Sequence, residues 1–469
     1  MITTMLTALL LVAPVAPAAA VTAADVDAVV ERYRAEVVVP GVAVAVTRGG
    51  TVVRTAGYGV TGDGEPVTDR TTMAVGSVGK SFTALAVLKL VEDGRLGLDD
   101  RVRDRLPEFT TADPRSAAIT VRQLLAQTSG LADTGFRAFS GPQPTDLRGA
   151  VAAMRDARLV ADPGTAWHYH NPNYQVAARL VEVVAGRPFA TYLREVVLGP
   201  LGMTDSRAVD REYELPPSAR GHVEVLGTAF AAPEPAGFGG GSGGVLSSAR
   251  DLASWLIAHR DGRGPDGTAI VSPATVALAH TEVADGYALG WFAHRTPSGA
   301  RLVDHGGDLF TATAYQALLP DSGYGVAVLA NTGLQYRAAQ SVGDRLIALL
   351  EGRTSPPPSD PTPLVDGVLL ALTAAVVVPV ARGVRRARRW VVGRRVPVVR
   401  LLPLLLPAVL LGTVHRVVGH LYRGRDVAWR QIPYLYPTFT VLLGTTALGC
   451  AVVLVARVVA LGRRRFSEE

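Results

Sequence analysis

One cysteine, Cys450, is present among the 469 residues, and it lies in a long apolar run near the C-terminus. A disulfide needs two thiols, so no intrachain disulfide can stabilise this chain. A domain formed by residues 25–352 is nevertheless large enough to bury a sufficient apolar core. Its fold must therefore rest on packing and hydrogen bonding.

Lysine is nearly as scarce as cysteine. The chain holds 47 basic residues, of which only Lys80 and Lys89 are lysines, so that 45 are arginines. Arginine keeps its proton throughout the pH range in which proteins function. Lysine at position 80 can therefore provide proton-transfer chemistry that an arginine could not.

Positive charge is absent from residues 1–7, whereas residues 6–12 are apolar and residues 16–20 read Ala-Pro-Ala-Ala-Ala. An apolar stretch that ends in small residues is typical of a secretory signal. We therefore expect residues 1–20 to be a signal peptide. The missing basic residue leaves an uncleaved anchor or a different start codon as alternatives.

The C-terminal part has the composition of a membrane segment. Residues 353–363 contain five prolines and are expected to form an extended linker. Beyond them, the apolar runs 364–381, 397–413 and 433–461 approach or exceed the length of about 20 residues that spans a bilayer. The second run is short and holds two prolines. Three transmembrane helices are thus predicted within residues 364–469.

The distribution of charge predicts the orientation of these helices. Residues 382–395 carry seven arginines, residues 419–431 carry three together with one aspartate, and residues 463–465 are all arginine. Basic loops tend to stay in the cytoplasm. We therefore expect a multi-pass protein of the cell membrane, with residues 382–395 inside, the N-terminal domain outside the cytoplasm, and lipid as one partner.

The net charge of +6 has a local origin. Residues 364–469 hold 16 arginines and four acids, a net charge of +12, which leaves −6 on residues 1–363. The positive charge therefore belongs to the membrane segment and gives no reason to expect nucleic acid as a partner.

The stretch AVGSVGKS, residues 74–81, allows two interpretations. Gly79-Lys80-Ser81 resembles the end of a phosphate-binding loop, but that motif needs a glycine where Ala74 stands and a buried strand before it. Nucleotide is therefore not expected. The other interpretation is a Ser-x-x-Lys pair. In such a pair, Ser77 is the nucleophile, and Lys80, one helical turn later, takes part in the transfer of its proton.

Two further elements follow in the chain. Tyr169-His170-Asn171 lies just before an amphipathic helix, and His305-Gly306-Gly307 follows a strand-like segment. With Ser-x-x-Lys, they make the chain resemble the penicillin-recognising serine hydrolases, and most closely the branch of class C β-lactamases, DD-peptidases and esterases. The resemblance covers roughly residues 25–350 and rests on the combination of motifs in this order.

The resemblance implies an α/β (α+β) fold of the β-lactamase/transpeptidase type. N- and C-terminal strands would form a central antiparallel sheet flanked by helices, and residues 77–255 a mostly helical subdomain beside it. The alternating segment 41–59, with Gly49-Gly50 at its turn, supports the N-terminal hairpin. The site would lie between sheet and helices.

The expected chemistry is acyl transfer through a covalent serine ester. Lys80 and Tyr169 would share the proton of the nucleophile Ser77, and Asn171 would bind the substrate amide or orient Lys80. By resemblance, the strand with His305, Gly306 and Gly307 borders the substrate, and the N–H groups of Ser77 and Asp308 bind the oxyanion. No metal or organic cofactor is expected.

Two local patterns suggest other sites. Gly240-Gly241-Ser242-Gly243-Gly244 matches a nucleophile elbow in letters, but its glycine-rich surroundings predict a loop. His168 and His170 form a histidine pair without a neighbouring third ligand, so a zinc site is not expected.

His305 departs from the β-lactamase pattern, in which a lysine provides a fixed cation. Histidine carries charge only below a pKa that is ordinarily near 6.5. We therefore expect a small ester or a peptide, such as a peptidoglycan-like one, to be a better substrate than a β-lactam. A slowly deacylating sensor and a binding domain with little turnover remain alternatives to a hydrolase.

Overall fold

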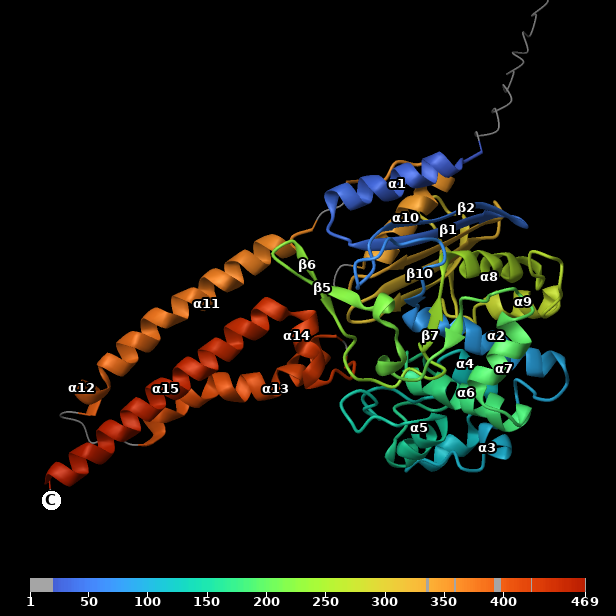
Figure 1. Ribbon diagram of the computed structural model, residues 1–469. Coiled ribbons are helices and arrows are strands. Elements are labelled where there is room, and N and C mark those ends of the chain that lie inside the picture. Colours follow the sequence, from blue (N-terminus) through green and yellow to red (C-terminus); the bar gives the residue numbers. More distant parts are fainter. Residues whose placement is uncertain (1–19, 335–336, 358–359, 392–397, 423, 469) are drawn as a thin grey trace, which may run out of the picture.

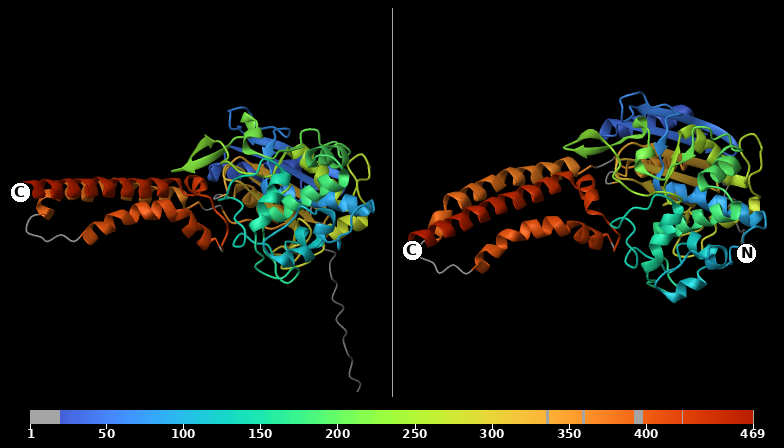
Figure 2. Two further views of the ribbon diagram at one scale, coloured as in Figure 1. Left: turned by 90° about the horizontal axis from the view of Figure 1, so that it is seen from below. Right: turned by 60° about the horizontal axis from the view of Figure 1, so that its bottom comes forward.

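The computed structural model describes residues 20–334, 337–357, 360–391, 398–422 and 424–468 (Figure 1). It comprises a globular body, from which three long helices project side by side (Figure 2). The predicted signal peptide, apart from Ala20, lies outside the described residues.

A six-stranded antiparallel sheet forms the centre of the body, in the order β2-β1-β11-β10-β9-β8. The two ends of the domain meet in its middle, where Val44 pairs with Val328. This confirms the predicted union of N- and C-terminal strands, including the hairpin at Gly49-Gly50. The strands are β1 (Gly41–Arg48), β2 (Thr51–Gly59), β8 (Phe292–Arg295), β9 (Arg301–Asp308), β10 (Thr313–Leu319) and β11 (Tyr324–Ala330).

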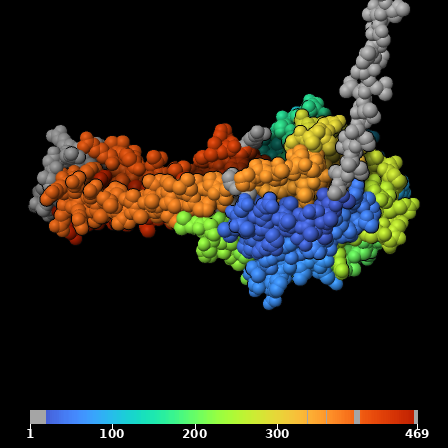
Figure 3. Space-filling model, turned by 90° about the horizontal axis from the view of Figure 1, so that it is seen from above, coloured from blue at the N-terminus to red at the C-terminus, as the bar shows by residue number. Residues whose placement is uncertain are grey.

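Helices cover both faces of this sheet, because the central strands are apolar on both sides. Val42, Val44 and Val46 face a cluster that includes α1 (Ala23–Glu36) and α10 (Ala338–Leu350). Ala43 and Ala45 face the larger cluster with α2 (Gly79–Glu92) and α8 (Ala249–Asp261). In the space-filling view, the surfaces of α1 (dark blue) and α10 (orange) adjoin (Figure 3).

The predicted helical subdomain packs around α2. Almost every residue of α2 is buried, and the ring of Phe82 stacks on Trp255 of α8 at 3.9 Å between centroids. Gly94, with a φ of +68°, follows the end of α2, as predicted. The other helices are α3 (Val102–Arg105), α4 (Val121–Leu125), α5 (Leu147–Ala153), α6 (Asn171–Ala185), α7 (Phe189–Leu193) and α9 (Pro273–His280).

Two small sheets interrupt this helical region. β3 (Met73–Ala74), β7 (Val245–Ser247) and β4 (Arg207–Ala208) form a three-stranded sheet next to the start of α2. β5 (Gly221–Val225) and β6 (Thr228–Ala232) form a hairpin near the projecting helices (Figure 1).

Among the residues that the structure describes, three helices are long and apolar enough to span a membrane: Thr362–Arg385, Val399–Leu421 and Pro437–Arg463. They belong to α11 (Thr362–Arg385), to a 3₁₀ turn (Val398–Leu405) that continues into α13 (Leu406–Leu421), and to α15 (Pro437–Glu468). The short helices α12 (Ala387–Val391) and α14 (Ile432–Leu435) precede the second and third spans.

The boundaries of two spans differ from the sequence expectation. The second helix continues past Thr413 to Leu421, because polar side chains in its last turns do not interrupt the backbone hydrogen bonds. The third begins at Pro437, because the residue before a proline disfavours helical angles. Tyr436 accordingly has φ −142° and ψ 68°, and it separates α14 from α15.

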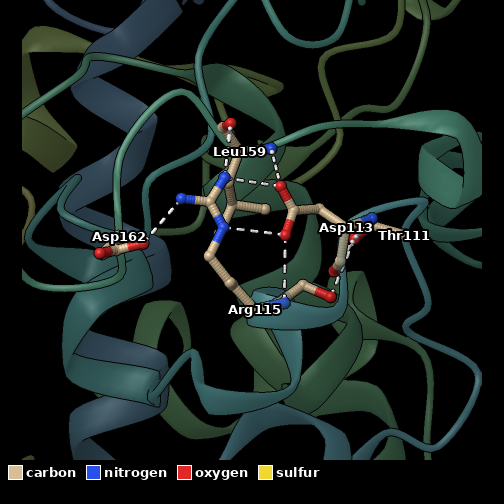
Figure 4. A network of polar contacts seen from close by, with 6 residues as sticks. Thr111, Asp113, Arg115, Leu159 and Asp162 are labelled. Carbon is tan, nitrogen blue, oxygen red and sulfur yellow. Dashed lines mark hydrogen bonds and ion pairs between the residues drawn. The ribbon is translucent and has the colours of Figure 1, made fainter.

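A polar network anchors the loop that leads to the Tyr169 segment (Figure 4). The Arg115 guanidinium donates to both carboxylate oxygens of Asp113 and, at 2.7 Å, to Asp162. It also donates to the carbonyl of Leu159 at 3.1 Å, while Asp113 accepts from the N–H of Leu159. One side chain thus holds residues 159–162 against the turn at residues 111–116.

Arg115→Ala should lower the unfolding temperature of the full chain, because it leaves Asp113 without its cation and frees residues 159–162. Arg155→Ala is the matched control, since Arg155 forms an ion pair with its exposed neighbour Asp156, and such surface pairs contribute about 0–1 kcal/mol. Thermal unfolding of both variants in detergent measures the difference. Equal unfolding temperatures would contradict the anchoring role.

Candidate active site

Ser77 lies in a sharp turn between a strand and a buried helix. β3 leads into a 3₁₀ turn (Gly76–Val78), and α2 follows directly at Gly79. Gly76 has a φ of +52°, and a side chain on it would lie 3.1 Å from the backbone nitrogen of Asp308. Ser77 is therefore in a 3₁₀ turn rather than in the first α-helical turn, and its side chain is only half-buried.

Lys80 is completely buried below Ser77. Its Nζ lies 3.0 Å from Ser77 Oγ and donates to the carbonyl oxygen of Ser242 at 2.7 Å. The amine also lies 4.8 Å from the centroid of the Tyr169 ring. The structure thus brings together the three residues that the sequence predicted to be catalytic.

The electrostatics of the site distinguish the two candidate bases. Burial lowers the pKa of Lys80 well below its usual range, and the nearby Arg425 lowers it further. Burial raises the pKa of Tyr169 above its usual value of about 10, although a hydrogen bond with Ser77 opposes this shift. Lys80 can therefore be a neutral amine in the resting site, whereas Tyr169 remains a neutral phenol.

Gln127 holds the backbone on both sides of Tyr169. Its carbonyl accepts from the N–H of His168, and its Oε1 accepts from the N–H of His170 and from Asn173. Gln127 itself has a φ of +62°, a conformation that is unusual for a residue other than glycine. The histidine pair contributes to this support, since His170 Nδ1 lies 2.7 Å from Asp133.

Asn171 is the first residue of α6 and lies on the wall of the cleft. Its Oδ1 is buried and has no hydrogen-bond partner among the described residues. An acceptor in that position is available to a donor group on a substrate.

The third motif packs directly against the turn that carries Ser77. A side chain on Gly307 would lie 1.9 Å from the carbonyl oxygen of Val75 and 3.3 Å from the nitrogen of Ser77. Only glycine permits such a close approach of β9. The backbone nitrogens of Ser77 and Asp308 therefore come close to each other, as an oxyanion site formed by these two groups requires.

His305 differs from the expectation of an ordinary histidine. Its side chain is buried, and burial together with the nearby Lys80 lowers its pKa to about 4. Nδ1 lies 2.6 Å from the carbonyl of Gly306, so this nitrogen carries the proton. The Tyr287 hydroxyl lies 3.3 Å from Nε2 and can donate to it. His305 therefore stays neutral at pH values well below 6.5, the ordinary histidine pKa on which the sequence expectation was based.

Sequence reasoning missed three contributions to this site. Gln127 supports the Tyr169 segment through its backbone carbonyl and its Oε1, and nothing in the residue type of Gln127 indicated this role. Tyr287, which packs edge-on against Tyr169 and His305, lies in the segment YALGW and could have been suspected from it. The carbonyl of Ser242 left no signal, because any residue provides a carbonyl.

The glycine-rich loop around Ser242 has the wrong geometry for a nucleophile elbow. β7 follows this loop instead of leading into it, and the Ser242 hydroxyl donates to the carbonyl of Gly239 at 3.3 Å. Its function in the structure is to bring a carbonyl to Lys80.

A cleft of about 1300 Å³ opens above Ser77. Its wall includes Tyr169, Asn171 and His305 from the globular body. Residues of the C-terminal segment also line it, namely Tyr422, Arg425, Asp426, Val427, Gln431 and Leu435.

Comparison with known proteins identifies a family for this chain. Residues 26–349 match the β-lactamase family model. Penicillin-binding protein 4 of Amycolatopsis lactamdurans is 33% identical over 358 residues, which cover 71% of this chain and 93% of that protein.

Solved structures share the fold. The octameric penicillin-binding protein homologue from Pyrococcus abyssi has a TM-score of 0.60 at 29% identity, covering 71% of this chain and 78% of that one. EstCE1, a hydrolase with promiscuous acyltransferase activity, has a TM-score of 0.58 at 21% identity, covering 68% and 97%.

The family model spans more than half of the chain and includes Ser77, Lys80, Tyr169 and His305. The fold and the relatives agree with it, while the apolar helices lie beyond the matched region. This protein therefore belongs to the β-lactamase family, whose fold is that of penicillin-binding proteins and related serine hydrolases.

Proposed function

We propose that this protein is a membrane-tethered, extracytoplasmic serine hydrolase. It would cleave an ester, a D-amino-acid peptide, or an amide or lactam bond through an acyl-enzyme on Ser77. The observation that carries the proposal is the buried Lys80 amine, which lies 3.0 Å from Ser77 Oγ. A neutral amine at this distance can accept the hydroxyl proton.

In the first step, Ser77 Oγ forms a bond to the substrate carbonyl carbon, and its proton moves to Lys80 Nζ. The carbonyl oxygen becomes an oxyanion, which the N–H groups of Ser77 and Asp308 stabilise. Asn171 binds the substrate beside the reacting carbonyl. The ammonium that forms at Lys80 remains bonded to the Ser242 carbonyl.

In the second step, the bond from the carbonyl carbon to the leaving group breaks, and the leaving oxygen or nitrogen takes a proton from the Tyr169 phenol. Lys80 returns a proton to Tyr169. Water then attacks the acyl-enzyme and gives a proton to Lys80, the carboxylic acid product leaves, and Ser77 regains its proton. The raised pKa of Tyr169 favours this role as an acid over a role as a resting base.

A second candidate function is that of an acylated sensor. The contact between the C-terminal segment and the cleft favours it, because a change in the position of Tyr169 on acylation could be transmitted through Arg425 to the apolar helices. Turnover separates the two functions. A hydrolase regenerates free Ser77 within the assay, whereas a sensor remains acylated, which intact mass measured over time distinguishes.

Ser77 should react with a fluorophosphonate probe, because the probe labels serine nucleophiles whose proton has an acceptor nearby. Peptide mapping should find the label on Ser77, absent from Ser77→Ala and retained in the control Ser242→Ala. Label on the Ser242 peptide would refute the proposal.

Lys80→Arg should abolish turnover, because arginine keeps the charge but cannot accept the proton. A loss of about 10²–10⁴ in kcat/KM is expected for a missing general base. Lys89→Arg is the matched control, since Lys89 forms an ion pair with Asp93 on the far end of α2 and should leave activity unchanged. Activity of Lys80→Arg within a few-fold of wild type, with unchanged melting, would exclude Lys80 as the base.

An uncharged acyl ester should be preferred over a cephalosporin, because a neutral His305 cannot offer a charge-assisted hydrogen bond to the lactam carboxylate. The pKa of about 4 at His305 further predicts that this preference changes little between pH 6 and 8. His305→Lys should shift it toward the cephalosporin. The ratio of kcat/KM for a p-nitrophenyl ester and a chromogenic cephalosporin measures this. A cephalosporin preference in wild type, or an unchanged ratio in His305→Lys, would contradict the argument.

The chain should cross the membrane three times with residues 382–395 in the cytoplasm. In a Cys450→Ala background, a cysteine at Arg386 should be protected from an impermeant maleimide in intact cells. A cysteine at the exposed Ser355 of the linker should react. Labelling of the Arg386 position from outside would overturn this topology.

A further inference from the structure

A segment between the second and third apolar helices contacts the candidate active site. Residues 424–431, here called the docking segment, connect α13 to α14. Arg425 donates to the carbonyl oxygen of Tyr169 at 2.9 Å, and its Nε lies 3.2 Å from Asp133. Its guanidinium lies 5.2 Å from the centroid of the Tyr169 ring. A residue 256 positions away in sequence thus touches both the backbone and the ring of the predicted catalytic tyrosine.

Hydrogen bonds on both sides of Arg425 fix the docking segment. Asp426 accepts from the N–H groups of Phe139 and Ser140 at 2.6 and 2.8 Å, and its own N–H donates to Asp133. Arg430 donates to the carbonyls of Phe139 and Ala236, each at 3.0 Å. These contacts reach two different loops of the globular body, so they define the position of the segment and not only its proximity.

Apolar packing extends the same interface toward the projecting helices. Phe310 and Leu334, from the ends of β9 and β11, pack against a cluster with Ile432 and Leu435. The ring of Tyr434 also lies edge-on to Phe310, at 6.3 Å between centroids. Burial of apolar side chains contributes to keeping Arg425 in place.

Asp133 explains why a cation is needed at this point. Its carboxylate is buried and contacts His170 on one side and Arg425 on the other. Burial opposes the charged form of Asp133, but the hydrogen bond with His170 and the cation of Arg425 lower its pKa overall. Removing one partner of a buried pair leaves the other charge uncompensated, which is strongly unfavourable.

We propose that Arg425 is a positioning residue of the active site, provided by the membrane segment, and that docking of residues 424–431 completes the site. Arg425 and Asp133 together hold Tyr169 and His170, and hence the start of α6, in the geometry that faces Ser77. The proposal rests on the hydrolase function proposed above and extends it to a residue outside the matched family region.

The same arrangement has an electrostatic consequence for Lys80. The Lys80 amine contacts the Ser77 hydroxyl, the Ser242 carbonyl and the rings of Tyr169 and Tyr174. The charged or titratable groups that act on it electrostatically are His305, Asp133 and Arg425. Arg425 lowers the pKa of Lys80, while Asp133 raises it. Loss of the cation should therefore move the deprotonation of Lys80 to higher pH, and loss of the carboxylate should move it to lower pH.

Steady-state kinetics of the full chain in nanodiscs tests the proposal. The pH dependence of kcat/KM with a p-nitrophenyl ester reports the pKa of the base in the free enzyme through its acidic limb. Arg425→Gln should shift this limb to higher pH and lower kcat/KM by up to about 100-fold at neutral pH, the order of loss expected for misplaced catalytic groups. Asp133→Asn should shift the limb to lower pH.

Two further variants separate charge from geometry and from docking. Arg425→Lys keeps the charge but lacks the planar guanidinium that reaches Tyr169 through Nη1 and Asp133 through Nε, so the acidic limb should stay in place while kcat falls. Arg430→Ala removes docking hydrogen bonds without touching Tyr169 or Asp133, so it should lower kcat/KM less than Arg425→Gln does. Arg155→Ala, which lies outside the docking segment, should match wild type. If the variants at Arg425 and Asp133 match the wild-type limb and rate, the proposal is wrong.

Failure of the proposal is distinguishable from failure of the proposed function. If the function itself is wrong, the wild-type chain neither hydrolyses the ester nor takes up a fluorophosphonate on Ser77. If only the role of Arg425 is wrong, wild type does both and the variants show no change in their pH dependence. Should Arg425→Gln not fold, the other two variants still test the proposal. Arg425→Lys should leave the acidic limb in place and lower kcat, and Asp133→Asn should shift the acidic limb to lower pH.

Discussion

The buried amine of Lys80, held between the Ser77 hydroxyl and the Ser242 carbonyl, is the interaction on which the site depends. Burying an ammonium is strongly unfavourable, and a buried amine is therefore driven toward its neutral form. Everything around it maintains that burial. α2 is apolar on nearly all sides, and the glycine-rich loop approaches so closely that a side chain on Gly243 would lie 3.2 Å from the backbone of Gly76.

The fold and the candidate catalytic residues were predicted from a family resemblance, which rests on three motifs in a fixed order, and each motif has a local signal. Ser77 and Lys80 are one helical turn apart, and Tyr169 immediately precedes a recognisable amphipathic helix. The alternation of β1 and β2 across Gly49-Gly50 likewise reveals a hairpin. Each of these features lies within a window in which periodicity or spacing has a direct structural meaning.

The remaining parts of the site depend on contacts that no local pattern encodes. The Ser242 carbonyl is a backbone group, so its involvement does not depend on residue type. The support from Gln127 requires a positive φ that favours glycine. The lowered pKa of His305 follows from its burial in the folded chain, and the residue type alone does not predict it. The contact of Arg425 with Tyr169 requires that two regions far apart in sequence fold against each other.

The contacts of Arg425 and its neighbours connect the globular body with the C-terminal apolar helices. Three helices with the length and composition of membrane spans follow a serine-hydrolase fold. The segment that connects the second and third of these helices lines the cleft above Ser77. Attachment to a membrane would not require the ion pair between Arg425 and the buried Asp133, so this contact supports the proposed structural role of the C-terminal segment at the site.

The protonation state of Lys80 tests the account most directly, and the scarcity of lysine makes it measurable. Lysine labelled with ¹³C at Cε gives a single lysine signal in the Lys89→Arg variant, and its chemical shift follows the charge on Nζ. The account predicts that this signal titrates well below the usual lysine pKa of about 10.4, because burial disfavours the ammonium form. A Lys80 signal that remains that of an ammonium ion up to pH 9 would contradict it.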